Sequence, residues 1–284
     1  MPTGPAIFDR ALLRARQKRA RLLGAETFLL DRVAEDVADR LSAVLRKFER
    51  AADVGTPTDA LQRKLAGKVG SLEAIEIGEN EVVHVPDASL DLAVSALALQ
   101  FVDDLPGVLV QIRRALKPDG LLLAAMIGGD SLAELRQAFA KAESEIEGGL
   151  SPRVAPFADL RDLGGLLQRA GFALPVVDSE RLTVRYDTVF DLMRDLRRMG
   201  ATNVLAERRR VPLRRKTLLR MAEIYSERFS DTDKRVRATF EIVWLSGWAP
   251  DPSQQKPLKP GSAKTRLADA LNTKEIPAGE KPRP

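Results

Sequence analysis

The 284-residue chain has no cysteine and only one histidine, His84. Without cysteine it can form no disulfide, no thiolate metal site, no iron–sulfur cluster and no cysteine nucleophile. A single imidazole leaves one candidate centre for a zinc site or a Ser-His-Asp triad, and His84 lies in a local apolar run between Val82 and Pro86. We therefore expect an ordinary strand or loop residue there. The sequence predicts no metal site and identifies no catalytic residue.

Aromatic residues and long apolar segments are also scarce. Aromatics make up 5% of the chain and do not alternate with its arginines, which argues against a stacking platform for single-stranded nucleic acid. No apolar run approaches the ~20 residues that span a bilayer. Residues 1–4 carry no apolar region typical of a signal peptide. These absences favour an intracellular protein.

The charge is modest but unevenly distributed. The formal net charge is +5, and two basic clusters stand out, at residues 10–21 and 208–220. Such clusters can contact an acidic protein partner, an anionic membrane or RNA, or they can simply form solvated helix faces. The sequence leaves these alternatives open, with nucleic acid the least favoured.

The most informative segment that the chain does contain is a strand–helix–strand unit from Leu90 to Met126. Its two apolar runs, 90–96 and 121–126, do not alternate with polar residues, which predicts strands of a parallel sheet buried on both faces. The helix between them leads into the turn Leu116-Lys117-Pro118-Asp119-Gly120. In this turn we expect Pro118 to end the helix and Gly120 to supply the positive φ.

The rest of the chain extends this unit to one α/β fold. We predict an N-terminal helical segment at 1–47, an α/β domain at 48–249 and a flexible tail at 250–284 that is poor in apolar residues. The domain carries a helical insertion at about 188–233, before its last strand, and a helix at 132–146 for which Ser131 is the expected N-cap. This order fits a doubly wound, mostly parallel sheet of seven strands.

Candidate ligand positions follow the first two predicted strands. Asp53 and Gly55 lie at a strand-to-helix turn, where ligands bind in such sheets. A glycine-rich loop would continue with glycines where this chain has Thr56-Pro57-Thr58, and Pro57 removes a donor amide, so no pyrophosphate site is expected. Glu76, after the second strand, is either an acceptor for ribose hydroxyls or a solvated strand-end residue.

Further blocks of sequence match a known family. They are Ile7-Phe8-Asp9-Arg10, Ser89-Leu90-Asp91-Leu92-Ala93-Val94-Ser95, Leu116-Lys117-Pro118-Asp119-Gly120, Gly128-Gly129-Asp130-Ser131, Glu147-Gly148-Gly149, Ser151-Pro152, Met199-Gly200 and Asn203. With these blocks the chain resembles class I S-adenosylmethionine-dependent methyltransferases. Within them it is similar to the mitochondrial complex I assembly factors with a methyltransferase fold and their alphaproteobacterial relatives. The match runs from about residue 7 to residue 263.

The resemblance implies a Rossmann-like fold that binds S-adenosylmethionine and a role in assembling respiratory complex I, with a subunit of that complex as protein partner. A relative is associated with hydroxylation of an arginine on a partner subunit, and a more distant one methylates a malonyl-thioester. The implied location is the bacterial cytoplasm, including the inner face of the membrane, where the basic clusters would make peripheral contact. The implied cofactor contacts are Asp53 and Gly55 at the methionine part, Glu76 at the ribose, and Ser95, Ala96 and Leu97 near the sulfonium.

Two functions stay open at this point. One is an enzyme that uses S-adenosylmethionine on a protein or small acid, with the insertion as a substrate lid. The other is a non-catalytic assembly factor that has lost cofactor binding. The second follows from Thr56-Pro57-Thr58, from the shortened segment 70–87, and from Gln100-Phe101 where relatives carry His-Trp. Each lost cofactor contact should weaken binding by about 1–3 kcal/mol.

Overall fold

The structure is a computed structural model that describes residues 6–157, 160–255, 262 and 265–274. The chain divides into two units, residues 1–250 and 251–284. The second unit contains the four-residue helix α9 (Leu267–Ala270). Much of the predicted tail lies outside the described residues. All of the features below belong to the first unit.

Six strands of the described chain form one sheet, whereas the sequence predicted seven. The strands are β1 (Arg50–Val54), β2 (Ser71–Ile75), β3 (Leu90–Ala96), β4 (Leu116–Ile127), β5 (Ala173–Tyr186) and β6 (Val236–Trp248). Their order is β2-β1-β3-β4-β6-β5, and β6 runs antiparallel to both of its neighbours. Between β2 and β3 the described chain forms only one isolated bridge, Ile77 with Val83, because this segment is too short for a helix and a further edge strand.

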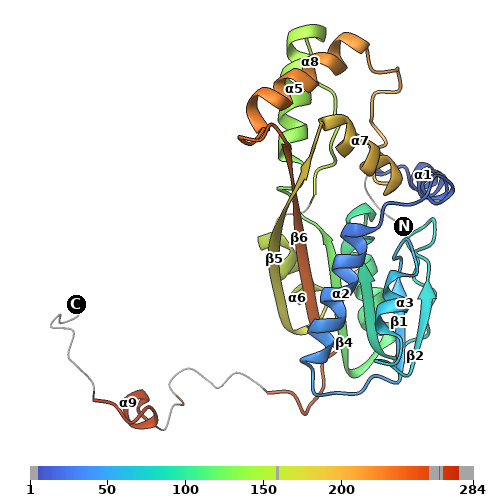
Figure 1. Ribbon diagram of the computed structural model, residues 1–284. Helices are drawn as coiled ribbons and strands as arrows, with labels where there is room; N and C mark the ends of the chain where they lie inside the picture. Colours follow the sequence, from blue (N-terminus) through green and yellow to red (C-terminus); the bar gives the residue numbers. More distant parts are fainter. Residues whose placement is uncertain (1–5, 158–159, 256–261, 263–264, 275–284) are drawn as a thin grey trace, which may run out of the picture. The chain divides into compact units, whose positions relative to one another are not determined.

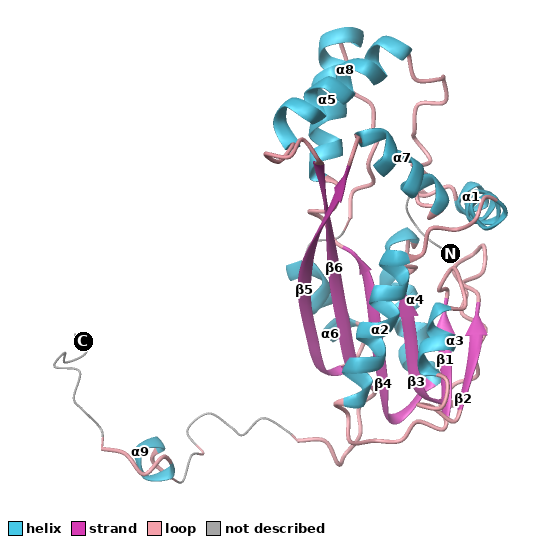
Figure 2. Ribbon diagram, in the orientation of Figure 1, coloured by secondary structure: helices cyan, strands magenta, loops and turns pink. Residues whose placement is uncertain are grey.

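Helices cover both faces of the sheet (Figure 2). On one face lie α2 (Phe28–Ser42) and α3 (Ala60–Leu65), and on the other lie α4 (Leu105–Ala115) and α6 (Leu160–Arg169). Strand β3 contributes Leu92 and Val94 to the first core and Ala93 to the second, all fully buried. This two-sided burial confirms the prediction drawn from its unbroken apolar run.

The segment 116–120, which was predicted as a turn, lies within β4 and differs from the prediction in its backbone. The positive φ belongs to Asp119, at +61°, and not to Gly120. The N–H of Asp119 donates to the carbonyl of Ala249 at 3.0 Å, and Ala249 donates back to Gly120 at 2.8 Å. A Cβ on Gly120 would lie 2.9 Å from the Lys117 carbonyl oxygen. Gly120 is therefore required by close packing of the backbone.

Strands β5 and β6 are longer than β4 and continue past it. Strand β4 pairs only with residues 242–248 of β6, whereas β5 pairs along nearly the whole of β6. Around the extended ends lie α5 (Ala133–Glu147), α7 (Val189–Arg198) and α8 (Arg215–Phe229) (Figure 1). Helices α7 and α8 occupy the predicted insertion. None of the helices in the described part of the chain is long and apolar enough to cross a bilayer.

Several family blocks serve this helical end of the unit. Ser131 was predicted to cap α5, but the N-cap position is occupied by Leu132, with φ +54°. The Ser131 hydroxyl instead donates to the Glu241 carbonyl at 3.2 Å and accepts from the Glu241 N–H at 2.8 Å. Glu143, 1% exposed, accepts from both the N–H and the hydroxyl of Ser151 at 2.7 and 2.6 Å. These blocks therefore join loops to strands and helices.

Two helices begin the described chain. Helix α1 (Arg10–Leu22) is capped by Asp9, whose carboxylate accepts from the Leu12 N–H at 2.9 Å. Gly24, with φ +80°, lies between α1 and α2. Helix α2 buries its apolar side in the same core as β3 and β4. The N-terminal helical segment is thus part of the compact unit 1–250.

Candidate functional site

Two adjoining cavities lie in the described unit, and the larger of these two lies at the carboxyl ends of β1 and β2. Its volume is about 490 Å³, which falls in the range of small-molecule sites. Asp53, Gly55 and Glu76 all line it, as does one side of α1. The structure thus brings together three residues that the sequence singled out and adds a helix that the sequence did not connect with them.

Asp53 is the most perturbed group in this cavity. Its side chain is 2% exposed. The amide nitrogen of Gln62 donates to Asp53 Oδ2 at 3.0 Å, whereas Asp53 Oδ1 and Gln62 Oε1 have no hydrogen-bond partner. Burial raises the pKa of Asp53 to about 6. Unpaired buried acceptors in a cavity are costly, so this pair is a candidate for binding a ligand donor.

The turn after Asp53 depends on one glycine. Gly55 has φ +78°, and a Cβ there would lie 3.0 Å from Ile77 Cδ1. Thr56 takes part in the fold, because its hydroxyl oxygen accepts from the Ala96 N–H at 3.0 Å. Pro57 has no N–H. The turn therefore keeps its shape, and Pro57 leaves it with one backbone donor fewer.

Glu76 follows β2 directly and is exposed at the cavity. It forms no ion pair with another described residue. Its position allows both of the roles considered from the sequence, a ligand contact and a solvated strand-end residue.

Glu81 organises the segment that replaces the missing strand, and no sequence pattern pointed to it. Its side chain is 5% exposed and its φ is +58°. Its carboxylate accepts from the N–H groups of Asp103 and Asp104 at 2.7 Å each. Arg10 lies 3.5 Å from it and donates to the carbonyl of Ile77 at 3.0 Å. Glu81 therefore links the loop after β2 to α1 and to the start of α4.

The three residues expected near the sulfonium have different environments. Ser95 is fully buried and donates to the Val54 carbonyl at 2.7 Å. Ala96 is held to Thr56 through its N–H. Neither residue lines a cavity described here, whereas Leu97, with φ +52°, lines a second one. A non-glycine residue in the left-handed region is uncommon and is found preferentially at functional sites.

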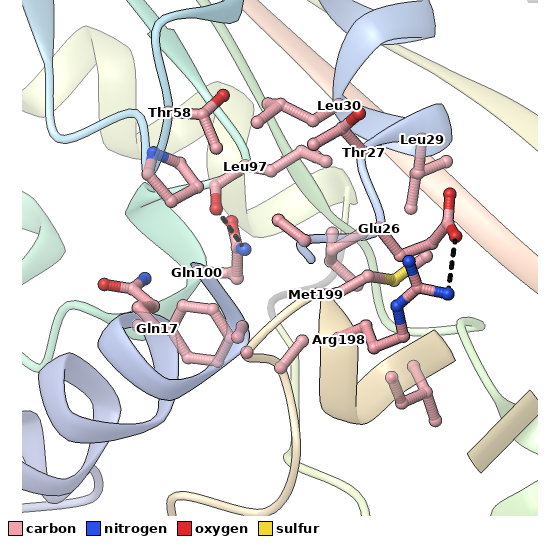
Figure 3. A pocket seen from close by; sticks show the side chains of 18 of the residues that line it. Gln17, Glu26, Thr27, Leu29, Leu30, Thr58, Leu97, Gln100, Arg198 and Met199 are labelled. Atoms are coloured by element: carbon pink, nitrogen blue, oxygen red, sulfur yellow. Dashed lines mark hydrogen bonds and ion pairs between the residues drawn. The ribbon is translucent and has the colours of Figure 1, made fainter. Parts of the chain in front are cut away.

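The second cavity is smaller and mostly apolar, with a volume of about 100 Å³. Figure 3 shows Leu29 and Leu30 of α2 and Met199 after α7 around it. Gln100, 7% exposed, donates from its amide nitrogen to the Leu97 carbonyl at 2.7 Å, and its Oε1 has no partner. The two cavities adjoin, since they share the lining residues Gln17, Arg21, Pro57, Thr58 and Phe101.

Five of the thirteen cations in the two basic clusters form ion pairs with other described residues. The pairs are Arg10–Glu81, Arg14–Glu79, Arg208–Asp9, Arg209–Glu147 and Arg220–Glu145. In the second cluster, four exposed cations form no ion pair with another described residue, namely Arg210, Arg214, Arg215 and Lys216. In the first cluster the same holds for Lys18, Arg19 and Arg21. The clusters are thus partly neutralised within the unit, and these seven cations remain exposed.

With the fold and the cavities established, comparison with known proteins assigns the family. A model of the methyltransferase domain matches residues 26–175. The human protein named arginine-hydroxylase NDUFAF5, mitochondrial, is 36% identical over 299 residues, covering 97% of this chain and 86% of the relative. The chain belongs to the methyltransferase-domain family that includes the NDUFAF5 proteins.

Other relatives agree with this assignment. The zebrafish (Danio rerio) NDUFAF5 protein is 36% identical over 289 residues, covering 94% of this chain and 90% of its own. A malonyl-[acyl-carrier protein] O-methyltransferase of Xylella fastidiosa is 39% identical over 177 residues, covering 62% of this chain and 58% of that protein. A solved methyltransferase-like structure from Bacillus halodurans has a TM-score of 0.51 at 15% identity, covering 76% of this chain and 99% of its own. That last likeness shows the shared fold.

The relatives also correct the predicted location. The prediction of a cytoplasmic protein was wrong, because relatives that match nearly the whole chain are mitochondrial by name. The absence of cysteine and of long apolar segments does not distinguish a bacterial cytoplasm from the interior of a mitochondrion. Composition alone therefore could not resolve this point.

Proposed function

We propose that the chain binds S-adenosylmethionine in the larger cavity and acts on a partner protein or small acid during assembly of respiratory complex I, including modification of an arginine on a partner subunit. The observation that carries the proposal is the convergence of Asp53, Gly55 and Glu76 on one cavity of about 490 Å³. The identity to the NDUFAF5 proteins supports the arginine and assembly parts.

The residues at the cavity fit the cofactor. Asp53 Oδ1 and Gln62 Oε1 are unpaired acceptors, suited to the donors of an ammonium group. The exposed carboxylate of Glu76 is suited to two ribose hydroxyls. When bound, S-adenosylmethionine supplies a methyl group already activated on a sulfonium, so the protein's share of such a transfer is mainly positioning.

The smaller cavity is the proposed acceptor site. It adjoins the larger one through Pro57 and Thr58 and is lined by Leu97 and Gln100. A volume of about 100 Å³ suits a single side chain or another small group. Gln100 would orient that group, because its amide nitrogen is fixed on the Leu97 carbonyl and its oxygen remains without a donor.

Calorimetric titration with S-adenosylmethionine and S-adenosylhomocysteine tests the proposal. We expect binding by the native chain, and a loss of roughly 10- to 100-fold in affinity for Asp53→Ala and for Glu76→Gln, as for one lost charged hydrogen bond. Glu73→Gln is the matched control, because Glu73 is an exposed carboxylate of β2 that does not line the cavity. No detectable binding at millimolar concentration would overturn the proposal.

One observation favours the second function, a non-catalytic assembly factor. Pro57 and Thr58 occupy positions where cofactor-binding loops carry glycines, and Pro57 offers no donor. The two functions separate in a deletion strain. If the chain acts only as a binding partner, the Asp53→Ala gene should restore complex I assembly as well as the native gene does. If the chain is an enzyme, the Asp53→Ala gene should not restore assembly.

Peripheral membrane contact is proposed only for the four exposed cations Arg210, Arg214, Arg215 and Lys216. Each cation near an anionic surface contributes about 1 kcal/mol of attraction. Cosedimentation with anionic and neutral vesicles, for the native chain and for a variant with all four residues changed to alanine, tests this contact.

A further inference from the structure

Four cations on one side of helix α1 line the larger cavity. Arg10, Arg14, Lys18 and Arg21 all line it, and their spacing of four, four and three residues places them on one side of the helix. Arg10 pairs with Glu81 and Arg14 with Glu79. Within the described part of the chain, Lys18 and Arg21 have no carboxylate partner. The guanidinium of Arg21 donates to the Pro57 carbonyl at 3.3 Å.

The position of α1 is fixed by the segment that follows α7. The Asp9 N–H donates to the Val204 carbonyl at 2.8 Å, and Arg16 donates to the carbonyl of Asn203. Gly200, with φ +71°, lets this segment approach so closely that a Cβ there would lie 2.9 Å from Gln17 Cα. The family residues Gly200 and Asn203 therefore dock α1 and hold its cations against the cavity.

The opposite wall of the cavity, formed by residues 53–62, carries no cation, and every cation that lines the cavity comes from α1. Pro57 has no N–H, and the Thr58 hydroxyl oxygen accepts from the Ala60 N–H at 3.2 Å. Asp53 and Gln62 contribute the unpaired oxygens Oδ1 and Oε1, which are acceptors in the ionised carboxylate and the amide. These unpaired oxygens suit an ammonium group and would repel a carboxylate placed beside them. The carboxylate of a zwitterionic amino-acid group would therefore need a cationic partner from α1, where Lys18 and Arg21 lie.

We propose that Arg21, assisted by Lys18, binds the carboxylate of the cofactor's amino-acid part, and so replaces the amide donor that Pro57 does not provide. The inference rests on the proposed function. Arg21 is the main partner because its contact with Pro57 places it at the junction of the two cavities. A guanidinium can also hold a carboxylate with two parallel hydrogen bonds.

Calorimetry with two ligands tests the inference on the full chain. The ligands are S-adenosylmethionine and decarboxylated S-adenosylmethionine, which differ only in the carboxylate. We expect the native chain to bind S-adenosylmethionine roughly 10- to 100-fold more tightly than the decarboxylated compound. In Arg21→Ala this preference should fall to nearly one, through weaker binding of S-adenosylmethionine alone. Lys18→Ala should show a smaller loss of the same kind.

Two matched variants complete the design. Arg19→Ala removes a cation from the same helix that lines neither cavity, and it should keep the native preference. Arg21→Gln keeps a donor for the Pro57 carbonyl and removes the charge, and it should behave as Arg21→Ala does. Arg21 is exposed, so both of its variants are expected to fold.

The outcomes separate the inference from the proposed function. If neither ligand binds to the native chain, the proposed function fails and the inference fails with it. If S-adenosylmethionine binds but the native chain does not prefer it, the inference alone is overturned. The same holds if Arg21→Ala and Arg21→Gln retain the full preference.

Discussion

Two parts of the sheet differ in how deeply they are buried: the half formed by β3 and β4, and the half formed by β1 and β2. Strand β3 and most of β4 are buried on both faces, whereas β2 lies at an edge and has no fully buried residue. The larger cavity lies in the second half, at the ends of β1 and β2. The strand that would extend this half is replaced by a loop held by Glu81.

The half formed by β3 and β4 therefore contributes mainly to stability, whereas the half formed by β1 and β2 carries the proposed ligand site. The half formed by β3 and β4 carries the apolar core and tolerates little change, because tightly packed interiors are sensitive to volume. The half formed by β1 and β2 has lost a strand and most loop glycines, yet it keeps the cavity, which α1 now helps to enclose. The fold and the ligand site can therefore be altered independently, and the following predictions use that independence.

The largest expected effect is on the packed half. Leu122→Ala in β4 removes a fully buried side chain and should lower the free energy of unfolding by about 2–5 kcal/mol. Leu72→Ala in β2, where the side chain is only half-buried, should cost less than half as much. Urea denaturation of both variants measures the contrast. Equal losses would show that the two halves are packed alike.

The next effect is a pH dependence at the cavity. Burial raises the pKa of Asp53 from 3.8 to about 6, so between pH 4 and 6 the folded chain retains a proton that the unfolded chain has released. The free energy of unfolding should therefore fall as the pH rises through this window, by about 2–3 kcal/mol for this group.

Asp53→Asn removes that titration. Relative to the native chain, the variant should become more stable by the same amount between pH 4 and pH 7, as measured by chemical denaturation at each pH. Parallel pH curves for the two proteins would mean that Asp53 has an ordinary pKa and that the cavity does not desolvate it.

A smaller effect is expected in the loop that replaces the missing strand. Glu81→Gln weakens the bonds to Asp103 and Asp104 and removes the charge beside Arg10, so we expect a loss of about 1–3 kcal/mol in the free energy of unfolding. Glu79→Gln changes a carboxylate that is 79% exposed, and its free energy of unfolding should stay within about 0.5 kcal/mol of the native value. Thermal unfolding of both variants makes the comparison, and a similar shift in both would contradict the organising role of Glu81.

The smallest effect on stability is expected far from both halves. The variant in which Arg210, Arg214, Arg215 and Lys216 are all alanine should unfold within about 0.5 kcal/mol of the native chain, since surface changes rarely do more. Its sedimentation with anionic vesicles should nevertheless fall. Unchanged sedimentation would remove these cations from the account of membrane contact.

Local sequence patterns predicted the packed half well. The range of β3 follows from one apolar run, and the end of α5 at Gly148, with φ +68°, follows from glycine's conformational freedom. Predictions failed where contacts distant in sequence decide the backbone. Asp119 takes the positive φ in the turn because its N–H reaches Ala249, 130 positions further along the chain.

The candidate site was predictable only in part. Asp53, Gly55 and Glu76 were found because they follow strands, and the structure places all three at one cavity. Glu81 and the cations of α1 were missed, because their roles depend on residues many positions away, such as Asp103 and Pro57. Ser95 and Ala96 were singled out by resemblance, yet they serve backbone contacts beside the site.

The central claim is that the half of the sheet with the missing strand still binds the cofactor. Hydrogen–deuterium exchange with and without saturating S-adenosylmethionine tests it most directly. We expect slower exchange in peptides covering residues 10–21, 53–62 and 74–78, and unchanged exchange in the paired strands β5 and β6. No change in the first three segments, or protection confined to another part of the chain, would contradict the account.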